Sequence, residues 1–238
     1  YNVMAAIGAA LSEGVDIKDI QAALSDFVSV AGRFELIEEG QSFSVVVAYA
    51  HTPDGLVKIL TTAKEIAKGR LITCFGCGGD RDKLKRPIMG RIAANYSDVV
   101  VITSDNPRTE DPEEIIREIA AGVQDISQHK SNLLYKTVTD RRAAIQYALS
   151  IAHNQDIVLI AGKGHEDYQI LKDKTVHFDD REEVRKALRG WEMASFTLGE
   201  ILKAVRGVLL QQGSHEYCTG VNTDTRTISP GELFIALQ

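Results

Sequence analysis

Five short apolar segments, separated by stretches with helical spacing, constrain the fold more than any other feature of this sequence. Residues 43–50 (FSVVVAYA) are rich in valine and lack the polar–apolar alternation of a half-exposed strand. Continuous apolar runs of this kind are typical of parallel strands that are buried on both faces. Similar segments follow at residues 71–75, 98–103, 133–138 and 156–161. The sequence therefore predicts an α/β fold with a doubly wound, mostly parallel, Rossmann-like sheet.

Helical segments fill the gaps between these strands. Pro53 and Pro112 stand at the expected first turns of helices over residues 54–68 and 112–123, where proline is well tolerated. Further helices are expected over residues 3–11, 17–27, 85–96 and 141–153.

The polar motifs of the chain follow the expected strands. AHTPD comes after the first strand, GCGGDRD after the second, SDNPR after the third and GKGHE after the last. In doubly wound sheets, ligands bind at the edge where the carboxyl ends of the strands meet. The sequence therefore predicts a single binding crevice formed by these four loops.

Two of these motifs carry side chains suited to a small zwitterion. Asn106 and Arg108 offer a planar amide and a guanidinium, which fit a ligand with a carboxylate beside an amine. The alternative is an Asx-type turn with a solvated arginine. Glu166 is the only obvious carboxylate placed to take an ammonium group, although it could also belong to a charged rim.

The glycine-rich and cysteine motifs have weaker functional signals. GCGGDRDKLKRP could hold an anion with its backbone N–H groups, but it lacks the GK[ST] ending of a P-loop and could equally be a tight turn. Cys74 and Cys77 have redox-motif spacing, yet they lie at a strand end, which favours incidental small residues. No second CxxC is present, so we predict no metal site.

Composition excludes some classes of protein. The net charge of −6 argues against a general nucleic-acid binder. An odd count of three cysteines without a signal peptide favours a cytoplasmic protein. No apolar run reaches the roughly 18–20 residues needed to span a bilayer.

Together, six motifs in a fixed order resemble the C-terminal domain of the Mur ligase family, in its diaminopimelate-adding (MurE-type) branch. These motifs are GRFE, AYAHTPD, GCGGDRDKLKRP, TSDNPRTEDP, TDRRAAI and AGKGHEDYQ. The resemblance covers residues 1 to about 190. It implies peptidoglycan precursor synthesis by an enzyme that uses ATP and Mg²⁺. Such an enzyme joins meso-diaminopimelate to UDP-N-acetylmuramoyl-L-alanyl-D-glutamate through an acyl phosphate.

The resemblance also implies roles for individual residues. It assigns diaminopimelate binding to Arg86, Asp105, Asn106, Arg108, Gly162 and Glu166. It assigns ATP binding to Asn2, Arg33 and His51. The family's P-loop and its magnesium-bearing lysine are missing, so we expect this chain to be inactive without the rest of its ligase chain. Ala48 stands where the family usually has an aspartate toward the ribose, which implies weaker nucleotide contact.

After Trp191 the pattern restarts. Residues 193–238 resemble the opening of a second Mur ligase of the D-alanyl-D-alanine-adding (MurF) type, as in a natural fusion. Here Asp224, Thr225 and Arg226 match a signature near the uridine nucleotide. A helix capped by Thr197 and ending near Gly207 is expected, with strands around 220–223 and 233–237. The expected domains are thus 1–30 (the end of a central ATP-binding domain), 31–190 (amino-acid recognition) and 193–238 (a partial UDP-binding domain).

Two other function classes stay open on the residues alone. A doubly wound fold could serve as a binding module without catalysis. A nicotinamide-dependent oxidoreductase is disfavoured, because no GxGxxG opens a helix after the first strand.

Overall fold

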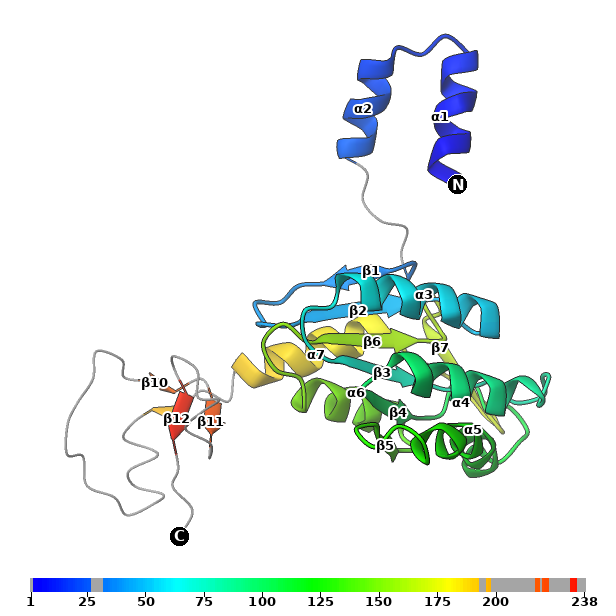
Figure 1. Cartoon of the computed structure of the whole chain (residues 1–238), viewed down its shortest axis with the longest axis vertical. Helices are drawn as coiled ribbons and strands as arrows, with labels where there is room; N and C mark the ends of the chain where they lie inside the picture. Colours follow the sequence, from blue (N-terminus) through cyan, green and yellow to red (C-terminus); the bar gives the residue numbers. More distant parts are fainter. Residues whose placement is uncertain are drawn as a thin grey trace.

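A six-stranded sheet forms the centre of residues 32–192 (Figure 1). The computed structural model describes residues 2–26, 32–192, 196–197, 217–218, 220–222 and 232–234. The strand order is β1-β2-β6-β3-β4-β5. The strands are β1 (Glu35–Ile37), β2 (Ser44–Ala48), β3 (Leu71–Phe75), β4 (Val99–Ile102), β5 (Leu134–Thr137) and β6 (Ile157–Ala161). All neighbours are parallel except β1, which is antiparallel to β2, so the predicted mostly parallel sheet is confirmed.

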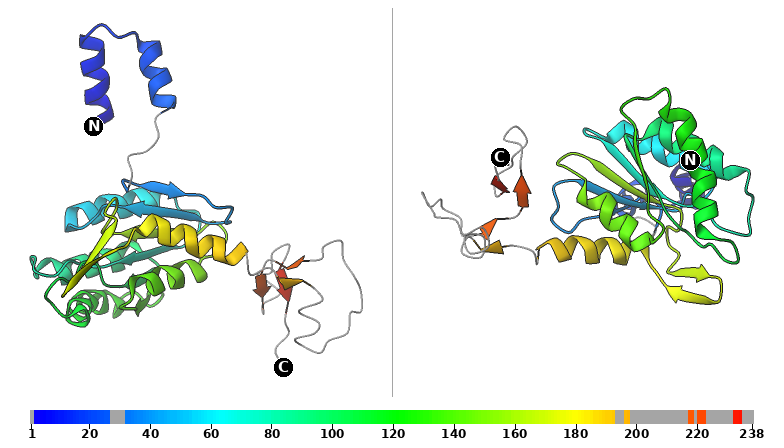
Figure 2. Two further views of the ribbon diagram at one scale, coloured as in Figure 1. Left: turned by 180° about the vertical axis from the view of Figure 1, so that it is seen from behind. Right: turned by 90° about the horizontal axis from the view of Figure 1, so that it is seen from below.

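Helices cover both faces of this sheet, as the apolar strands predicted (Figure 2). One face carries α3 (Pro53–Ile66), α4 (Lys85–Tyr96) and α5 (Pro112–Ser127), and the other carries α6 (Arg141–Ser150) and α7 (Asp180–Glu192). In β2, Val46 and Ala48 pack in the first layer, whereas Val45 and Val47 pack in the second. Because both sides of the strand are buried, apolar residues occupy every position from Val45 to Ala48.

Side chains just before the helices fix where the helices begin. Thr52 accepts a hydrogen bond from the Gly55 N–H, and Pro53 follows it at the first helical position of α3. The Asp111 carboxylate likewise caps α5, and Asp140 caps α6 by accepting from the Ala143 N–H. Each cap satisfies a backbone donor that the first helical turn leaves without a partner. The loops between strands and helices are therefore held at both ends.

Three elements of this domain were not predicted from the sequence. Strand β1 adds one strand at the edge of the sheet, and a hairpin of β7 (Tyr168–Leu171) and β8 (Lys174–His177) follows β6. Helix α7 is joined to the β1 segment by ion pairs, in which Glu35 meets Arg181 and Arg185, and Glu39 meets Arg189. The glutamate of the GRFE motif thus joins the first strand to the last helix of the domain.

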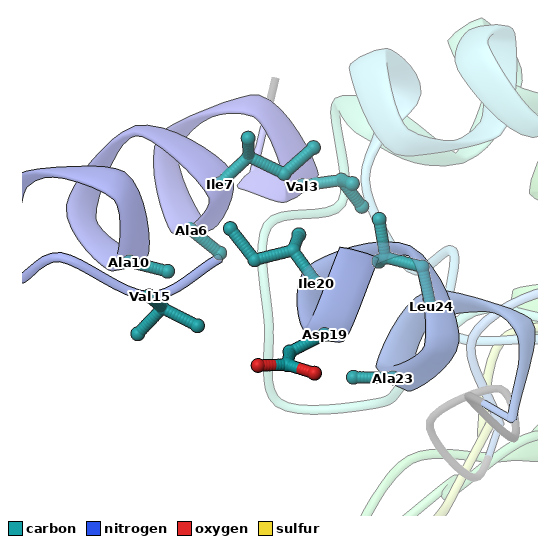
Figure 3. Close-up of a pocket in the computed structure, with 9 residues that line it drawn as sticks. All are labelled: Val3, Ala6, Ile7, Ala10, Val15, Asp19, Ile20, Ala23 and Leu24. Carbon is teal, nitrogen blue, oxygen red and sulfur yellow. The ribbon is translucent and has the colours of Figure 1, made fainter. Parts of the chain in front are cut away.

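Helices α1 (Asn2–Ser12) and α2 (Ile17–Ser25) form a separate pair near the N-terminus, as predicted (Figure 1). Their facing surfaces leave an open apolar groove, which Figure 3 shows at close range. Val3, Ala6, Ile7 and Ala10 line it from α1, while Ile20, Ala23 and Leu24 line it from α2. These helices have no glycine-rich or charged cluster in the groove, so we assign them no chemistry.

Short strands lie beyond Trp191. Strand β9 (Phe196–Thr197) pairs antiparallel with β10 (Tyr217–Cys218), and β11 (Gly220–Asn222) pairs parallel with β12 (Glu232–Phe234). The last two agree with the strands expected around 220–223 and 233–237. Thr197 is in β9, while the expected helix from there to Gly207 lies outside the described residues. So do the second-ligase candidates Asp224, Thr225 and Arg226.

Candidate functional site

Four loops meet at the carboxyl edge of the sheet. The loop at 49–52 follows β2, the loop at 162–167 follows β6, the loop at 76–84 follows β3 and the loop at 103–111 follows β4. Strands β2, β6, β3 and β4 are consecutive in the sheet, so their loops are neighbours. This arrangement is the crevice position that parallel α/β sheets use for ligands, and all four polar motifs lie there.

The Asn106 side chain connects three of these segments. Its carbonyl oxygen Oδ1 accepts from Lys163 Nζ at 3.0 Å and from the Ile170 N–H at 2.9 Å. Its amide Nδ2 donates to Glu166 Oε2 at 3.0 Å. These partners fix which way the amide points, since only its oxygen can accept and only its nitrogen can donate. Asn106 therefore binds the β4 loop to the β6 loop and to the β7–β8 hairpin.

Lys163 is a functional candidate that sequence reasoning missed. Its side chain is fully buried, and its Nζ lies 3.7 Å from Asp105 Oδ1 and 3.8 Å from Glu166 Oε2. Burial lowers the pKa of this ammonium, and the charge of Asp105 partly opposes that effect. The sequence signal was a lysine between two glycines at a strand end, which reads equally well as a solvated turn. We define the Lys163 cluster as Lys163, Asp105, Asn106 and Glu166.

Gly162 is required by the close approach of Asp105. A Cβ at Gly162 would lie 2.8 Å from Asp105 Oδ2, and the φ of Gly162 is +120°, which side chains rarely adopt. On its other side, Asp105 is fixed by a hydrogen bond from Gln169 Nε2 to its main-chain oxygen at 2.8 Å. The structure thus brings the predicted Asp105 and Gly162 into direct proximity.

Arg108 lies half-buried at the turn that follows Asn106. Its φ of 54° is in the left-handed region, and its backbone N–H donates to the Ile170 oxygen. Arg108 Nη1 donates to the Gly79 main-chain oxygen at 2.8 Å, which joins the DNPR turn to the glycine-rich loop. Among the described residues, no carboxylate oxygen lies within ion-pair distance of the Arg108 guanidinium, which distinguishes it from the buried Arg86 and Arg141.

Arg86, which is expected to bind diaminopimelate, lies at the start of α4 beside the glycine-rich loop. Its side chain is fully buried, and its two terminal nitrogens donate to Glu110, Glu118 and the Gly78 oxygen. The charge of the guanidinium is therefore offset by glutamates of this chain, and its hydrogen bond to the Gly78 oxygen holds the glycine-rich loop in place. Arg81, on the same loop, is exposed, and its hydrogen bond within the described chain goes to the neighbouring Asp80 oxygen. Arg81 is thus an exposed cation that a ligand can reach, whereas Lys83 on the same loop is paired with Glu110.

A second buried arginine lies beneath the crevice. Arg141 Nε and Nη2 donate to the two oxygens of Asp180, each at 2.7 Å, and both side chains are fully buried. Arg141 also donates to the main-chain oxygens of Ser104 and Ala161, where the β4 and β6 loops begin. Burial alone would lower the pKa of Arg141, but the Asp180 charge and hydrogen bonds raise it above its usual value. This pair fixes the two loops relative to α7.

An aromatic rim lies beside the Lys163 cluster. The Tyr49 ring is 4.5 Å from the His51 ring and 5.1 Å from the His165 ring, measured between centroids. Burial and the charge of Glu166 raise the pKa of Tyr49, while Arg33 acts in the opposite direction. Both His51 and Arg33 are exposed. The structure therefore groups two of the three predicted nucleotide residues around a tyrosine that the sequence did not single out.

The remaining nucleotide positions are not assembled with this rim. Asn2 is the first residue of α1, in the helical pair that stands apart from the sheet in Figure 1. Ala48 is fully buried and packs in the apolar layer with Val46 and Leu56, so it does not line the crevice.

Two further observations bear on chemistry. Cys74 and Cys77 are free and buried, and burial raises the pKa of both thiols to about 12. Within the described chain, no group of three or more His, Cys, Asp or Glu side chains could hold a metal ion. No helix in that part of the chain has the length and apolarity to cross a membrane.

Comparison with known proteins identifies the family. The model of the Mur ligase glutamate ligase domain matches residues 32–164. The chain belongs to the Mur ligase family. The UDP-N-acetylmuramoyl-L-alanyl-D-glutamate–2,6-diaminopimelate ligase of Clostridium botulinum is 52% identical over 191 residues, which are 79% of this chain and 38% of that protein. The ligase of the same name from Syntrophomonas wolfei is 54% identical over 190 residues, which are 80% of this chain and 38% of that protein.

Solved structures agree with this family membership. One of a diaminopimelate ligase of the same name has a TM-score of 0.63 and 41% identity, covering 80% of this chain and 38% of that one. The alanine ligase MurC of Thermotoga maritima shares the fold. Its structure has a TM-score of 0.55 and 18% identity, covering 81% of this chain and 37% of that one. The chain thus spans well under half the length of the Mur ligases that it matches.

Proposed function

We propose that this chain is the amino-acid-recognition domain of a ligase that adds meso-diaminopimelate to UDP-N-acetylmuramoyl-L-alanyl-D-glutamate. The names of the relatives that are about half identical to it support this substrate. Since those proteins extend well beyond the matched region, the complete activity belongs to a longer protein, and the rest of that ligase chain is a partner of this domain.

The observation that carries the proposal is the hydrogen bond between Asn106 and Glu166, with Arg108 beside them. Diaminopimelate has two ammonium and two carboxylate groups. Arg108, whose guanidinium has no carboxylate within ion-pair distance among the described residues, would take the distal carboxylate. Glu166 and Asp105 would accept from the distal ammonium, and the Asn106 amide would orient both. Gly162 would leave room for the ligand's approach, Arg81 would add a second cation at the rim, and Arg86 would position the glycine-rich loop.

The proposed reaction has two steps. The carboxylate of the nucleotide-linked dipeptide attacks the γ-phosphorus of ATP, which releases ADP and forms an acyl phosphate. The amine of diaminopimelate, after loss of a proton, attacks the acyl carbon, and inorganic phosphate leaves as the amide forms. This domain holds the amine in line with the acyl carbon, and such positioning accounts for a large part of the rate of a bimolecular reaction.

The aromatic rim fits one side of a nucleotide site. Arg33 offers a positive charge, and Tyr49 and His51 offer exposed ring faces on the neighbouring loop. ATP would supply the phosphoryl group that activates the carboxylate. We assign Mg²⁺, together with most of the phosphate contacts, to parts of the ligase outside this chain. Asn2 would reach the nucleotide only if α1 and α2 belong to the end of the central ATP-binding domain, as their separation from the sheet suggests.

The domain limits follow from the same proposal. Residues 1–30 would end the central domain, and 31–190 would form the recognition domain. Residues 193–238 would begin the UDP-binding domain of a second, D-alanyl-D-alanine-adding ligase in a fused protein, with Asp224, Thr225 and Arg226 near its uridine nucleotide.

The test is Arg108→Ala in the full-length ligase that contains this domain. We expect kcat/KM for diaminopimelate to fall by roughly a hundredfold or more, because a carboxylate would be buried without its cation. The KM for ATP should stay within about threefold. Arg117→Ala, at an exposed position of α5, is the matched control and should change neither value. Unchanged kinetics in Arg108→Ala would reject this function in favour of a binding module whose crevice serves another ligand.

A further inference from the structure

Lys163 is a buried cation that the proposed function does not yet explain. Among the residues that the structure describes, its Nζ makes one direct hydrogen bond, to Asn106 Oδ1, and it lies 5.6 Å from the centre of the Tyr168 ring. Both carboxylates of its cluster are beyond hydrogen-bond distance of the ammonium, at 3.7 and 3.8 Å. Burying an ammonium without a direct carboxylate partner is unfavourable. The buried position of Lys163 is therefore better explained by an electrostatic role in the crevice than by a contribution to the stability of the fold.

The charges of the Lys163 cluster and Arg108 sum to zero only when Lys163 is counted. Asp105 and Glu166 contribute two negative charges, and Lys163 and Arg108 contribute two positive ones. The two neighbouring buried arginines do not change this sum. Arg141 is paired with Asp180, while Arg86 and Lys83 together offset the two glutamates Glu110 and Glu118.

We propose that Lys163 is a specificity-determining positioning residue that, together with Arg108, offsets the charges of Asp105 and Glu166, so that the crevice selects a net-neutral diamino diacid over a net-cationic diamino monoacid. The proposal rests on the proposed function and refines it. Diaminopimelate has no net charge near neutral pH, whereas lysine, which lacks the distal carboxylate, has one positive charge. A neutral crevice at low dielectric favours diaminopimelate. Without Lys163 the crevice would have a net negative charge and would attract lysine.

Lys163 also acts through Asn106. By donating to Oδ1, it leaves the amide nitrogen directed at Glu166, so the carboxylate keeps one fixed orientation. A methionine at this position would keep the unbranched stem but remove the charge and the donor. An arginine would keep the charge and a donor.

The experiment compares Lys163→Met with Lys163→Arg in the full-length ligase that contains this domain, with diaminopimelate and L-lysine as substrates. In Lys163→Met, the ratio of kcat/KM for diaminopimelate to that for lysine should fall roughly tenfold or more. The change should lie in the KM of the amino acids, with the KM for ATP unchanged within about threefold. Lys163→Arg should keep the ratio within about threefold of wild type.

A double variant separates charge from structure. Asp105→Asn combined with Lys163→Met restores a neutral crevice, so the preference for diaminopimelate should return even though both native side chains are missing. A ratio that stays at the wild-type value in Lys163→Met, or an equal loss for both amino acids, would overturn the proposal. So would a double variant that behaves like Lys163→Met.

Asp105→Asn alone keeps the proposal testable if Lys163→Met does not fold. That variant makes the crevice net positive, so the preference for diaminopimelate over lysine should rise several-fold, and an unchanged ratio would refute the charge argument. Failure of the proposed function has a different signature. A wild-type ligase that does not use diaminopimelate would reject the function itself, whereas a selective wild type with an unaltered Lys163→Met ratio would reject only the role of Lys163.

Discussion

Removing Arg141 should destabilise the domain more than any exposed ion-pair change. Arg141→Met leaves Asp180 fully buried without its cation and frees the main-chain oxygens of Ser104 and Ala161. Breaking a buried pair by removing one partner costs about 3–5 kcal/mol. For a domain of this size, each kcal/mol shifts the melting temperature by roughly 2–4 °C, so we expect a fall on the order of 10 °C.

The assay is urea denaturation of the chain, followed by circular dichroism and extrapolated linearly to water. Lys58→Met is the matched control, because Lys58 and Asp54 form an exposed pair on α3 and its loss should cost under about 0.5 kcal/mol. Combining Arg141→Met with Asp180→Leu removes both buried charges and should recover most of the stability. Equal destabilisation by Arg141→Met and Lys58→Met would refute the reasoning, since it would mean that the buried pair contributes no more than an exposed one.

Three further predictions concern other groups. Cys74 and Cys77 should stay unmodified when the native chain is treated with iodoacetamide near neutral pH, because burial raises the pKa of both thiols to about 12; alkylation of either, seen by mass spectrometry, would contradict this. The hydrogen bond from Arg86 lowers the pKa of Glu110 from 4.5 to about 2, so its stabilising effect should be complete above pH 4.5 and lost toward pH 2. Glu110→Gln should flatten that part of the pH–stability curve, and identical curves would show that the pair contributes nothing. Ala48→Asp should lower the free energy of unfolding by about 1–3 kcal/mol, since a carboxylate would enter an apolar layer; an unchanged urea midpoint would show that the aspartate finds a partner.

The central sheet could be predicted from the sequence because its strands are buried on both faces. Continuous apolar runs such as Ile157–Ala161, when turn residues follow them, are characteristic of such strands. Strand β1 has only three residues, and the β7–β8 hairpin is largely polar, so neither has a clear signal. Helix α7 was not predicted, although Val184, Ala187 and Leu188 are spaced as one face of a helix. For this helix the sequence does contain a usable pattern.

The location of the site was predictable, whereas the roles of its cations were not. The alternation of strands and helices predicts a mostly parallel sheet, and the carboxyl ends of parallel strands meet at one edge, where the four loops lie. The sequence does not reveal that Arg86 pairs with Glu118 on α5 and with Glu110 in the loop before α5. Nor does it reveal that Lys163 is buried, since lysine in a loop is usually solvated. Ala48, which stands where the family usually has an aspartate, packs in the apolar layer.

The position of β6 has a consequence for how the chain folds. β6 is the last strand of the sheet to be synthesised, yet it lies between β2 and β3, with Ser44 beside Ile157. Until β6 emerges from the ribosome, β2 and β3 each present an unpaired edge, and the centre of the sheet cannot close. Pairings between segments so distant in sequence slow folding, and exposed apolar edges favour aggregation. Truncation before Ile157 should therefore yield an insoluble product, even though the earlier strand–helix units already contain most of the apolar residues of the sheet.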